Sequence, residues 1–354
     1  MRWKLITIFI SLQTDSSHMF SKSKVFLFSI IFSFTYLIFS CEKPNEVKQK
    51  TSAEKTNQSL SVNFNADSAY FYIEKQVNFG KRVPNTKAHV ITKDYLVSKL
   101  EQFGWKTQIQ SFEANAFDGK KLKLFNIIAS YNPESSKRIL LCAHWDTRPF
   151  ADQEESLEKK YQPIDGANDG ASGVAVLLEI ARTISNSTQK PNIGIDIVLF
   201  DGEDYGQPDF IEMDRKSDTW CLGSQHWSKN PHVANYQAYY GILLDMVGAK
   251  NAKFALDGTS RYFAPGIQKK VWDKANALGY GNYFVYTETE EIIDDHYYIN
   301  KIAKIPTIDI IDYDPSDGAY FGNYWHKHED NLDSIDKNTL FAVGTVVLHL
   351  LYED

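Results

Sequence analysis

Cysteine is scarce in this sequence, and long runs of positive charge are missing. The 354 residues include 3 cysteines, and acidic side chains outnumber basic ones, so the formal net charge is -7. The lack of a block rich in lysine and arginine argues against a nucleic-acid-binding surface. A small molecule, a peptide or a protein is therefore the better expectation for a partner. Internal repeats are also lacking.

The few cysteines leave two alternatives open. Cys41 lies in the N-terminal segment, Cys142 lies in an apolar strand pattern, and Cys221 begins a predicted helix. Cys142 and Cys221 could pair in an oxidising compartment, or they could remain two separate buried thiols.

The N-terminal segment, residues 1–41, has the layout of a bacterial secretory signal. After Met19, the candidate start, two lysines precede an apolar run at 25–39, and Ser40 comes directly before Cys41. The ending LIFSC resembles a lipobox, whose cysteine is lipidated and becomes the mature N-terminus. A transmembrane anchor is the alternative, although the apolar run is slightly short for one. We expect an exported protein, lipid-anchored in the bacterial envelope on its periplasmic side or at the cell surface.

The rest of the chain divides into a tether and a domain. Residues 42–63 hold almost no apolar side chains and are expected to be disordered. The chain is 43% hydrophobic, which is enough for a substantial core. We expect residues 64–354 to form a single catalytic α/β domain.

Apolar strand patterns alternate with amphipathic helical patterns in this domain. Strand patterns lie at 104–112, 121–131, 138–146, 193–204, 240–248 and 305–312, and helical patterns at 66–78, 87–103, 170–186, 221–229, 262–278, 295–302 and 336–352. This alternation predicts a three-layer α/β/α sandwich with a mixed, largely parallel central sheet.

Acidic and histidine side chains gather where the predicted strands end. Three strands carry such groups at their carboxyl ends: His144 and Asp146, then Glu203 and Asp204, then Asp245. Ligands of open α/β sheets bind beyond the carboxyl ends of the strands, so these groups should converge on one crevice.

Two residues outside the strands can join this crevice. Asp169 lies at a predicted helix start, and His326 lies in the loop after the strand at 305–312. Taken alone, Asp169 has a plainer interpretation as a helix N-cap. Several carboxylates crowded at one edge would repel one another unless a positive group lay between them, and a divalent metal is the natural counter-charge.

Zinc suits this set of side chains. Catalytic zinc takes three protein ligands of nitrogen or oxygen type and keeps one position open, and Asp169, Asp204 and His326 can supply the three. Glu203, next to Asp204 but differently directed, would remain free for proton transfer.

These motifs fall in the order and approximate spacing of the zinc aminopeptidase superfamily. The resemblance is carried by HWD (144–146), NDGASG (168–173), DGED (201–204), LLDMVG (243–248), DDH (294–296) and YWHKHED (324–330), together with the region 77–105. Within that superfamily the chain most resembles the glutaminyl cyclases, or glutaminyl-peptide cyclotransferases, of animals and bacteria. The resemblance covers roughly residues 66–352.

The resemblance implies a role for each of several residues. It implies one zinc ion per chain, a proton shuttle at Glu203, a hydrogen-bonded carboxylate pair and an aromatic pocket wall. The residues are Asp169, Asp204 and His326 for the metal, Asp245 and Asp294 for the pair, and Trp325 and Phe321 for the wall. If the carboxylate pair shares a proton, Asp245 is held back from a second metal.

Two features favour a cyclase over an aminopeptidase. Asp294 stands where typical aminopeptidases have serine in their SDH motif, and Trp325 precedes the last histidine where they commonly have tyrosine. Ile293, by contrast, departs from the glutamine of the animal cyclases. The resemblance implies a zinc-dependent acyltransferase that converts N-terminal glutamine of peptides and proteins to pyroglutamate and releases ammonia.

Two other hypotheses stay open. A co-catalytic zinc aminopeptidase is favoured if two metals bind, and His144, Asp169 and Asp245, supported by Asp146, could complete a second site. The other hypothesis is a binding lipoprotein on an inactive peptidase scaffold. It would be supported by the loss of a metal ligand or of the shuttle residue, but the sequence has all of these residues, so it ranks last. For partners we expect a peptide or protein with N-terminal glutamine, no nucleic acid, membrane contact only through the lipid anchor, and a monomer.

Two acidic segments complete the predictions. Residues 148–164 and 205–220, the second of which contains Trp220, are expected to form loops over the site. Trp145 and Trp227 are expected to serve packing rather than recognition.

Overall fold

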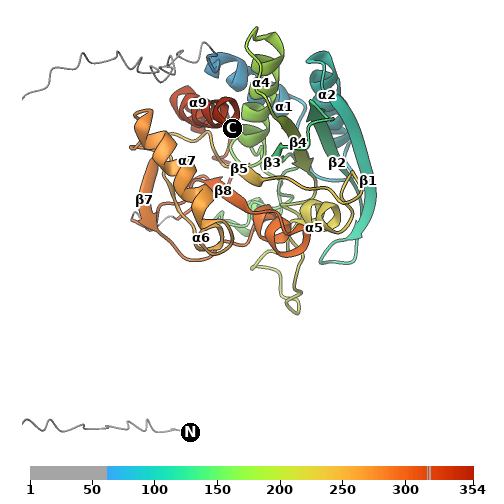
Figure 1. Cartoon of the computed structure of the whole chain (residues 1–354). Coiled ribbons are helices and arrows are strands. Elements are labelled where there is room, and N and C mark those ends of the chain that lie inside the picture. Colours follow the sequence, from blue (N-terminus) through green and yellow to red (C-terminus); the bar gives the residue numbers. More distant parts are fainter. Residues whose placement is uncertain (1–61, 317, 319) are drawn as a thin grey trace, which may run out of the picture. The chain divides into compact units, whose positions relative to one another are not determined.

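A six-stranded mixed sheet forms the centre of the computed structural model, which describes residues 62–354 except 317 and 319 (Figure 1). The predicted signal segment and nearly all of the tether lie outside these residues. The strands are β1 (Lys106–Asn115), β2 (Lys121–Tyr131), β3 (Arg138–His144), β4 (Gly194–Phe200), β5 (Tyr240–Asp245) and β8 (Thr307–Ile311). Their order is β1-β2-β4-β3-β5-β8, with β1, β2 and β4 joined antiparallel and β4, β3, β5 and β8 joined parallel.

Helices cover both faces of the sheet (Figure 1). They are α1 (Ala66–Asn78), α2 (Lys87–Gln102), α3 (Leu157–Lys160), α4 (Ala171–Asn186), α5 (Leu222–Lys229), α6 (Gly258–Phe263), α7 (Pro265–Ala277), α8 (Asp295–Tyr298) and α9 (Lys337–Glu353). Helices α1, α4 and α9 pack together on one face, and α5 and α8 pack on the other. The predicted α/β/α sandwich is confirmed. No helix in the described part of the chain is both long enough and apolar enough to span a membrane.

The central strands are buried along their whole length. Every residue of β3, β4 and β5 is buried, because these strands have helices on both sides. Nearly all of α4 is buried as well, since it packs against the sheet on one side and against α1 and α9 on the other. Cys142 on β3 and Cys221 before α5 are free and buried, so the alternative of two separate thiols holds.

Two helix predictions were wrong, and some short elements were not anticipated. The single helix expected at 262–278 is two helices, because Pro265 has no N–H to continue α6 and instead begins α7. The helix expected at 295–302 is the short α8 followed by a π-helix, Ile299–Ala303. A small parallel pair, β6 (Phe254–Leu256) and β7 (Phe284–Glu288), and a 3₁₀ turn, Leu332–Ser334, were not anticipated.

Gly173 determines how closely α4 approaches the sheet. A Cβ atom added there would lie 2.1 Å from the backbone oxygen of Leu244 on β5 and 3.0 Å from the Cβ of Ala143 on β3. We predict that Gly173→Ala lowers the free energy of unfolding by about 1–3 kcal/mol, because the helix must move away from the strands.

Gly266→Ala on α7 is the matched control, since nothing lies within 4 Å of its added Cβ. Chemical denaturation should find this variant as stable as the wild type or slightly more stable. Equal losses in the two variants would contradict the close approach at Gly173.

Candidate active site

The side chains predicted at the strand ends meet at a cavity at the carboxyl edge of the sheet. The cavity has a volume of about 640 Å³. Among the residues that line it are Asp169, Glu203, Asp204, Asp245, Asp294, Phe321, Trp325 and His326. The remaining predicted residues, His144 and Asp146, are buried behind this lining and contact it.

Asp146 holds the turn that presents Glu203 and Asp204. Its two carboxylate oxygens accept the backbone N–H groups of Glu203 at 3.1 Å and of Asp204 at 3.2 Å. Gly202, at φ 70°, allows the chain to turn directly after β4. Asp146 therefore supports the two cavity residues through their backbone.

Asp169, Asp204 and His326 form a compact group that could hold a metal ion. The ligand atoms of these buried residues lie within 4.8 Å of one another. His326 Nε2 is 3.3 Å from Asp204 Oδ1 and 3.7 Å from Asp169 Oδ2. Within the described residues, Asp204 Oδ2 is buried without a hydrogen-bond partner. One imidazole nitrogen, two carboxylates and a buried oxygen without a partner fit a zinc ion.

The crowding of carboxylates is visible in the pKa of Asp204. Burial, followed by the charge of Asp169, raises this pKa to about 6. A cation between the two carboxylates would offset their mutual repulsion and lower this pKa.

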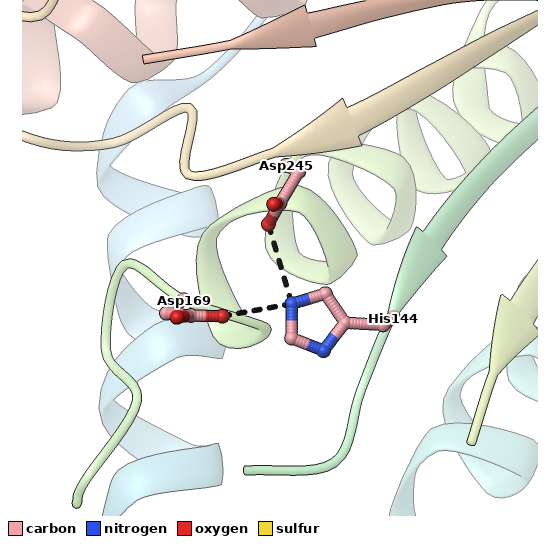
Figure 2. Close-up of side chains that lie close together, drawn as sticks. All are labelled: His144, Asp169 and Asp245. Carbon is pink, nitrogen blue, oxygen red and sulfur yellow. Dashed lines mark hydrogen bonds and ion pairs between the residues drawn. The ribbon is translucent and has the colours of Figure 1, made fainter. Parts of the chain in front are cut away.

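A second group, His144, Asp169 and Asp245, lies beside the first and shares Asp169 with it (Figure 2). His144 Nε2 is 3.0 Å from Asp169 Oδ1 and 3.2 Å from Asp245 Oδ1. Figure 2 shows the imidazole of β3 pointing between the two carboxylates. Burial opposes protonation of His144, but hydrogen bonds to Asp146, Asp169 and Asp245 raise its pKa well above the usual value.

Glu203 belongs to neither of these two groups. Its Oε1 lies 3.3 Å from the Sγ atom of Cys221, and its Oε2 lies 3.9 Å from His144 Nδ1. Burial raises the pKa of Glu203 well above its ordinary value, and the charge of Asp294 adds to this effect while His144 opposes it. A carboxyl group with a raised pKa in a cavity is suited to accept and return a proton near neutral pH.

Asp245 and Asp294 interact through their charges. Burial raises the pKa of Asp245 to about 7, with the charge of Asp294 adding to it and His144 opposing it. The hydrogen bond that the structure shows for Asp245 runs to His144, while Asp294 accepts the backbone N–H of Asp295 at the start of α8. A proton shared directly between the two carboxyl groups stays a prediction.

Aromatic rings form one wall of the cavity. The ring centroid of Phe321 lies 4.8 Å from that of Trp325 and 4.8 Å from that of Tyr313, which also lines the cavity. Trp325 stacks on His326 at 3.8 Å between centroids. The wall therefore runs from Tyr313 through Phe321 and Trp325 to His326 of the metal group.

Several contributors were missed because their role depends on contacts between distant segments. Asp330 accepts the backbone N–H groups of Asn168 and Asp169, and so fixes the loop that carries a predicted ligand. Trp220 lines the cavity and stacks on His326. The only sequence signals were that Asp330 ends the motif YWHKHED and that Trp220 ends an acidic loop segment.

We predict that Asp146→Asn weakens the binding of a divalent metal and lowers stability by about 1–3 kcal/mol. The amide NH₂ would face one of the two backbone N–H groups that the carboxylate now accepts. Metal titration and thermal unfolding measure the two effects. Asp94→Asn, at an exposed carboxylate on α2, is the control and should change stability by no more than about 0.5 kcal/mol. Unchanged metal affinity in Asp146→Asn would contradict the supporting role.

The chain is similar in sequence and fold to several known proteins. The family model "Peptidase family M28" matches residues 126–351. A glutaminyl cyclase from Bacteroides thetaiotaomicron, solved with N-acetylhistamine bound, is 54% identical with a TM-score of 0.80, and the match covers 82% of this chain and 99% of that one. A Zn-dependent exopeptidase from Parabacteroides distasonis is 52% identical with the same TM-score and coverage. The glutaminyl-peptide cyclotransferase of Dictyostelium discoideum is 24% identical over 90% of this chain and 94% of its own length. The chain therefore belongs to peptidase family M28.

Proposed function

We propose that the protein is a zinc-dependent glutaminyl-peptide cyclotransferase, which converts N-terminal glutamine of peptides and proteins to pyroglutamate and releases ammonia. One observation carries the proposal: Glu203 lies beside the group Asp169, Asp204 and His326 without belonging to it, in a cavity with an aromatic wall. The likeness to a bacterial glutaminyl cyclase at 54% identity supports it.

Asp169, Asp204 and His326 would hold one zinc ion per chain. When bound, zinc supplies Lewis-acid polarisation of the γ-amide carbonyl oxygen of the substrate. A single ion follows if Asp245 shares a proton with Asp294, as the resemblance implies, because Asp245 is then held back from a second ion.

The substrate supplies its own nucleophile. Its α-amine attacks the γ-carbonyl carbon of the same glutamine, a new C–N bond closes a five-membered lactam, and the bond to the amide nitrogen breaks. Glu203 accepts a proton from the amine and returns it to the departing nitrogen, which leaves as ammonia. Phe321 and Trp325 confine the side chain so that amine and carbonyl meet in near-attack geometry.

A zinc aminopeptidase is the second candidate. It is favoured by the likeness to a Zn-dependent exopeptidase at 52% identity and by the group His144, Asp169 and Asp245, which could hold a second ion. Such an enzyme would need water as its nucleophile and would release a free amino acid.

We further propose that the protein is exported and anchored by a lipid at Cys41, and that it works as a monomer. The lysines at 22 and 24, the apolar run at 25–39 and the ending LIFSC support export and lipidation. The membrane would then be contacted only through the anchor, and substrates would be peptides or proteins outside the cytoplasm.

The two candidate activities give different products. The fragment from residue 60, purified with its metal retained, is incubated with a peptide that begins with glutamine, and the products are identified by mass spectrometry. Loss of ammonia from an otherwise intact peptide, abolished by a chelator and restored by zinc, is the expected result. Release of free glutamine would establish the aminopeptidase instead.

We predict that Glu203→Gln keeps its zinc but loses about 10²- to 10⁴-fold in rate, because the amide cannot accept the proton of the substrate amine. Ammonia release measures the rate, and elemental analysis measures the zinc. Glu291→Gln, an exposed residue that lines the same cavity, is the control and should keep most of the activity. Near-normal activity in Glu203→Gln would rule out the shuttle.

Replacing the histidine of the metal group should remove zinc itself, whereas Glu203→Gln should keep it. We predict that His326→Ala lowers zinc affinity by more than about 100-fold, the upper end of the effect usual for residues that only support a ligand. His328→Ala removes an imidazole two residues away, which contacts Glu154 rather than the metal group, and should retain zinc. Full zinc occupancy in His326→Ala would show that the ligand set is wrong.

A further inference from the structure

His326 has a backbone conformation that its surroundings must hold in place. Its φ of 53° lies in the left-handed region, which is strained for a residue other than glycine. The predicted loop at 148–164 contacts the backbone of His326 and, through a different residue, that of His328. The N–H of Gln153 donates to the backbone oxygen of His326 at 3.3 Å, and Glu154 Oε1 accepts the N–H of His328 at 3.2 Å.

The side chain of His326 is held by the same loop. Its buried Nδ1 atom lies 3.0 Å from Asp152 Oδ1, while Nε2 faces Asp204 and Asp169. The two atoms are within ion-pair distance, although the ring N–H direction does not meet the geometry of a hydrogen bond and Nδ1 has no other partner among the described residues. An Nδ1–H turned toward Asp152 would leave the lone pair of Nε2 for a metal and would restrain the ring from turning. Asp152 thus occupies the side of the ring away from the metal group.

Asp152 is itself held by a buried arginine. Arg148 donates from Nε to Asp152 Oδ1 at 2.7 Å and from Nη2 to Oδ2 at 2.6 Å, a two-pronged pair with little rotational freedom. Its Nη1 donates to the backbone oxygen of Asp204 at 2.9 Å. The same guanidinium lies over Trp220, 4.2 Å from the ring centroid, and Trp220 stacks on His326.

We propose that Asp152 is a positioning residue, which, fixed by Arg148, orients the imidazole of His326 so that Nε2 is presented to zinc. The inference rests on the zinc site of the proposed function. Arg148 connects the two metal-binding segments, because it contacts both Asp152 behind His326 and the backbone of Asp204. The loop at 148–164 is therefore part of the metal site, although it supplies no ligand.

The test compares zinc affinities by competition with a chromophoric chelator, together with the visible absorption spectrum of the Co²⁺-substituted protein. Asp152→Asn preserves the shape of the side chain but removes its charge, and zinc affinity should fall by about 10- to 100-fold. The Co²⁺ spectrum should change as well, because the histidine ligand is no longer held in one orientation. Asp152→Glu, which keeps the charge that Arg148 needs, should recover part of the affinity.

Two control variants separate orientation of the ligand from general tethering of the loop. Glu155→Gln changes an exposed carboxylate of the same loop, and Glu154→Gln changes the residue that holds His328 rather than His326. Both should bind zinc with affinity close to that of the wild type. A loss in Glu154→Gln equal to that in Asp152→Asn would overturn the specific role of Asp152.

The possible outcomes also distinguish this inference from the proposed function. A variant that folds poorly lowers the number of binding sites per chain but leaves the Kd and the Co²⁺ spectrum of the folded fraction unchanged, and that result would overturn the inference. Equal zinc affinity in wild type and Asp152→Asn would also overturn it while leaving the zinc site intact. If the wild type itself takes up no zinc, the proposed metal site is wrong and the role of Asp152 fails with it.

Discussion

The site depends on the burial of many carboxylates at one edge of the sheet. A buried carboxylate is tolerated only where hydrogen-bond donors or cations replace the water it has lost. Two kinds of compensation are present. Asp146 and Asp330 each accept two backbone N–H groups, and the side chains of His144 and Arg148 lie among the remaining acids. These interactions offset the buried charge and also fix the loops. The same contacts therefore stabilise the carboxylates and position the site.

The carboxylates are not stabilised equally, and this difference suits the proposed chemistry. Asp169 is held by His144, and that contact, with the charge of His326, lowers its pKa despite burial. Glu203 has no comparable partner, so burial raises its pKa. Two neighbouring carboxylates, Glu203 and Asp204, leave the same turn with different surroundings: one faces Cys221 and the open cavity, and the other faces His326. One strand end thus provides both a metal ligand and a group free to move a proton.

The sequence predicted those parts of the structure that follow from local pattern. Near-continuous apolar strand patterns identified the parallel sheet, and the rule that ligands bind at carboxyl ends correctly placed His144, Glu203 and Asp245 at one edge. Trp145 and Trp227 are fully buried, as predicted for packing residues. The break at Pro265 was also readable, since proline cannot continue a helix, but the apolar periodicity on both sides of it obscured the break.

The contacts that could not be predicted join segments far apart in the chain. Asp152 reaches His326, and Asp330 reaches the backbone of Asn168, only because two loops fold over the same strand ends. Neither spacing nor composition predicts such a pair. From the sequence alone Arg148 would be expected to be an ordinary solvent-exposed charge, yet it is completely buried. The strand-end pattern and the resemblance to a family both supplied the candidate ligands, whereas the residue proposed to orient one of them is identified by its contacts in the folded chain.

The number of zinc ions in the active protein is the most direct test of this account. The account requires one ion, held by Asp169, Asp204 and His326. Native mass spectrometry of protein that is actively releasing ammonia from a glutaminyl peptide gives this number. One zinc per chain is the predicted result, and two per chain in the active protein would contradict the account.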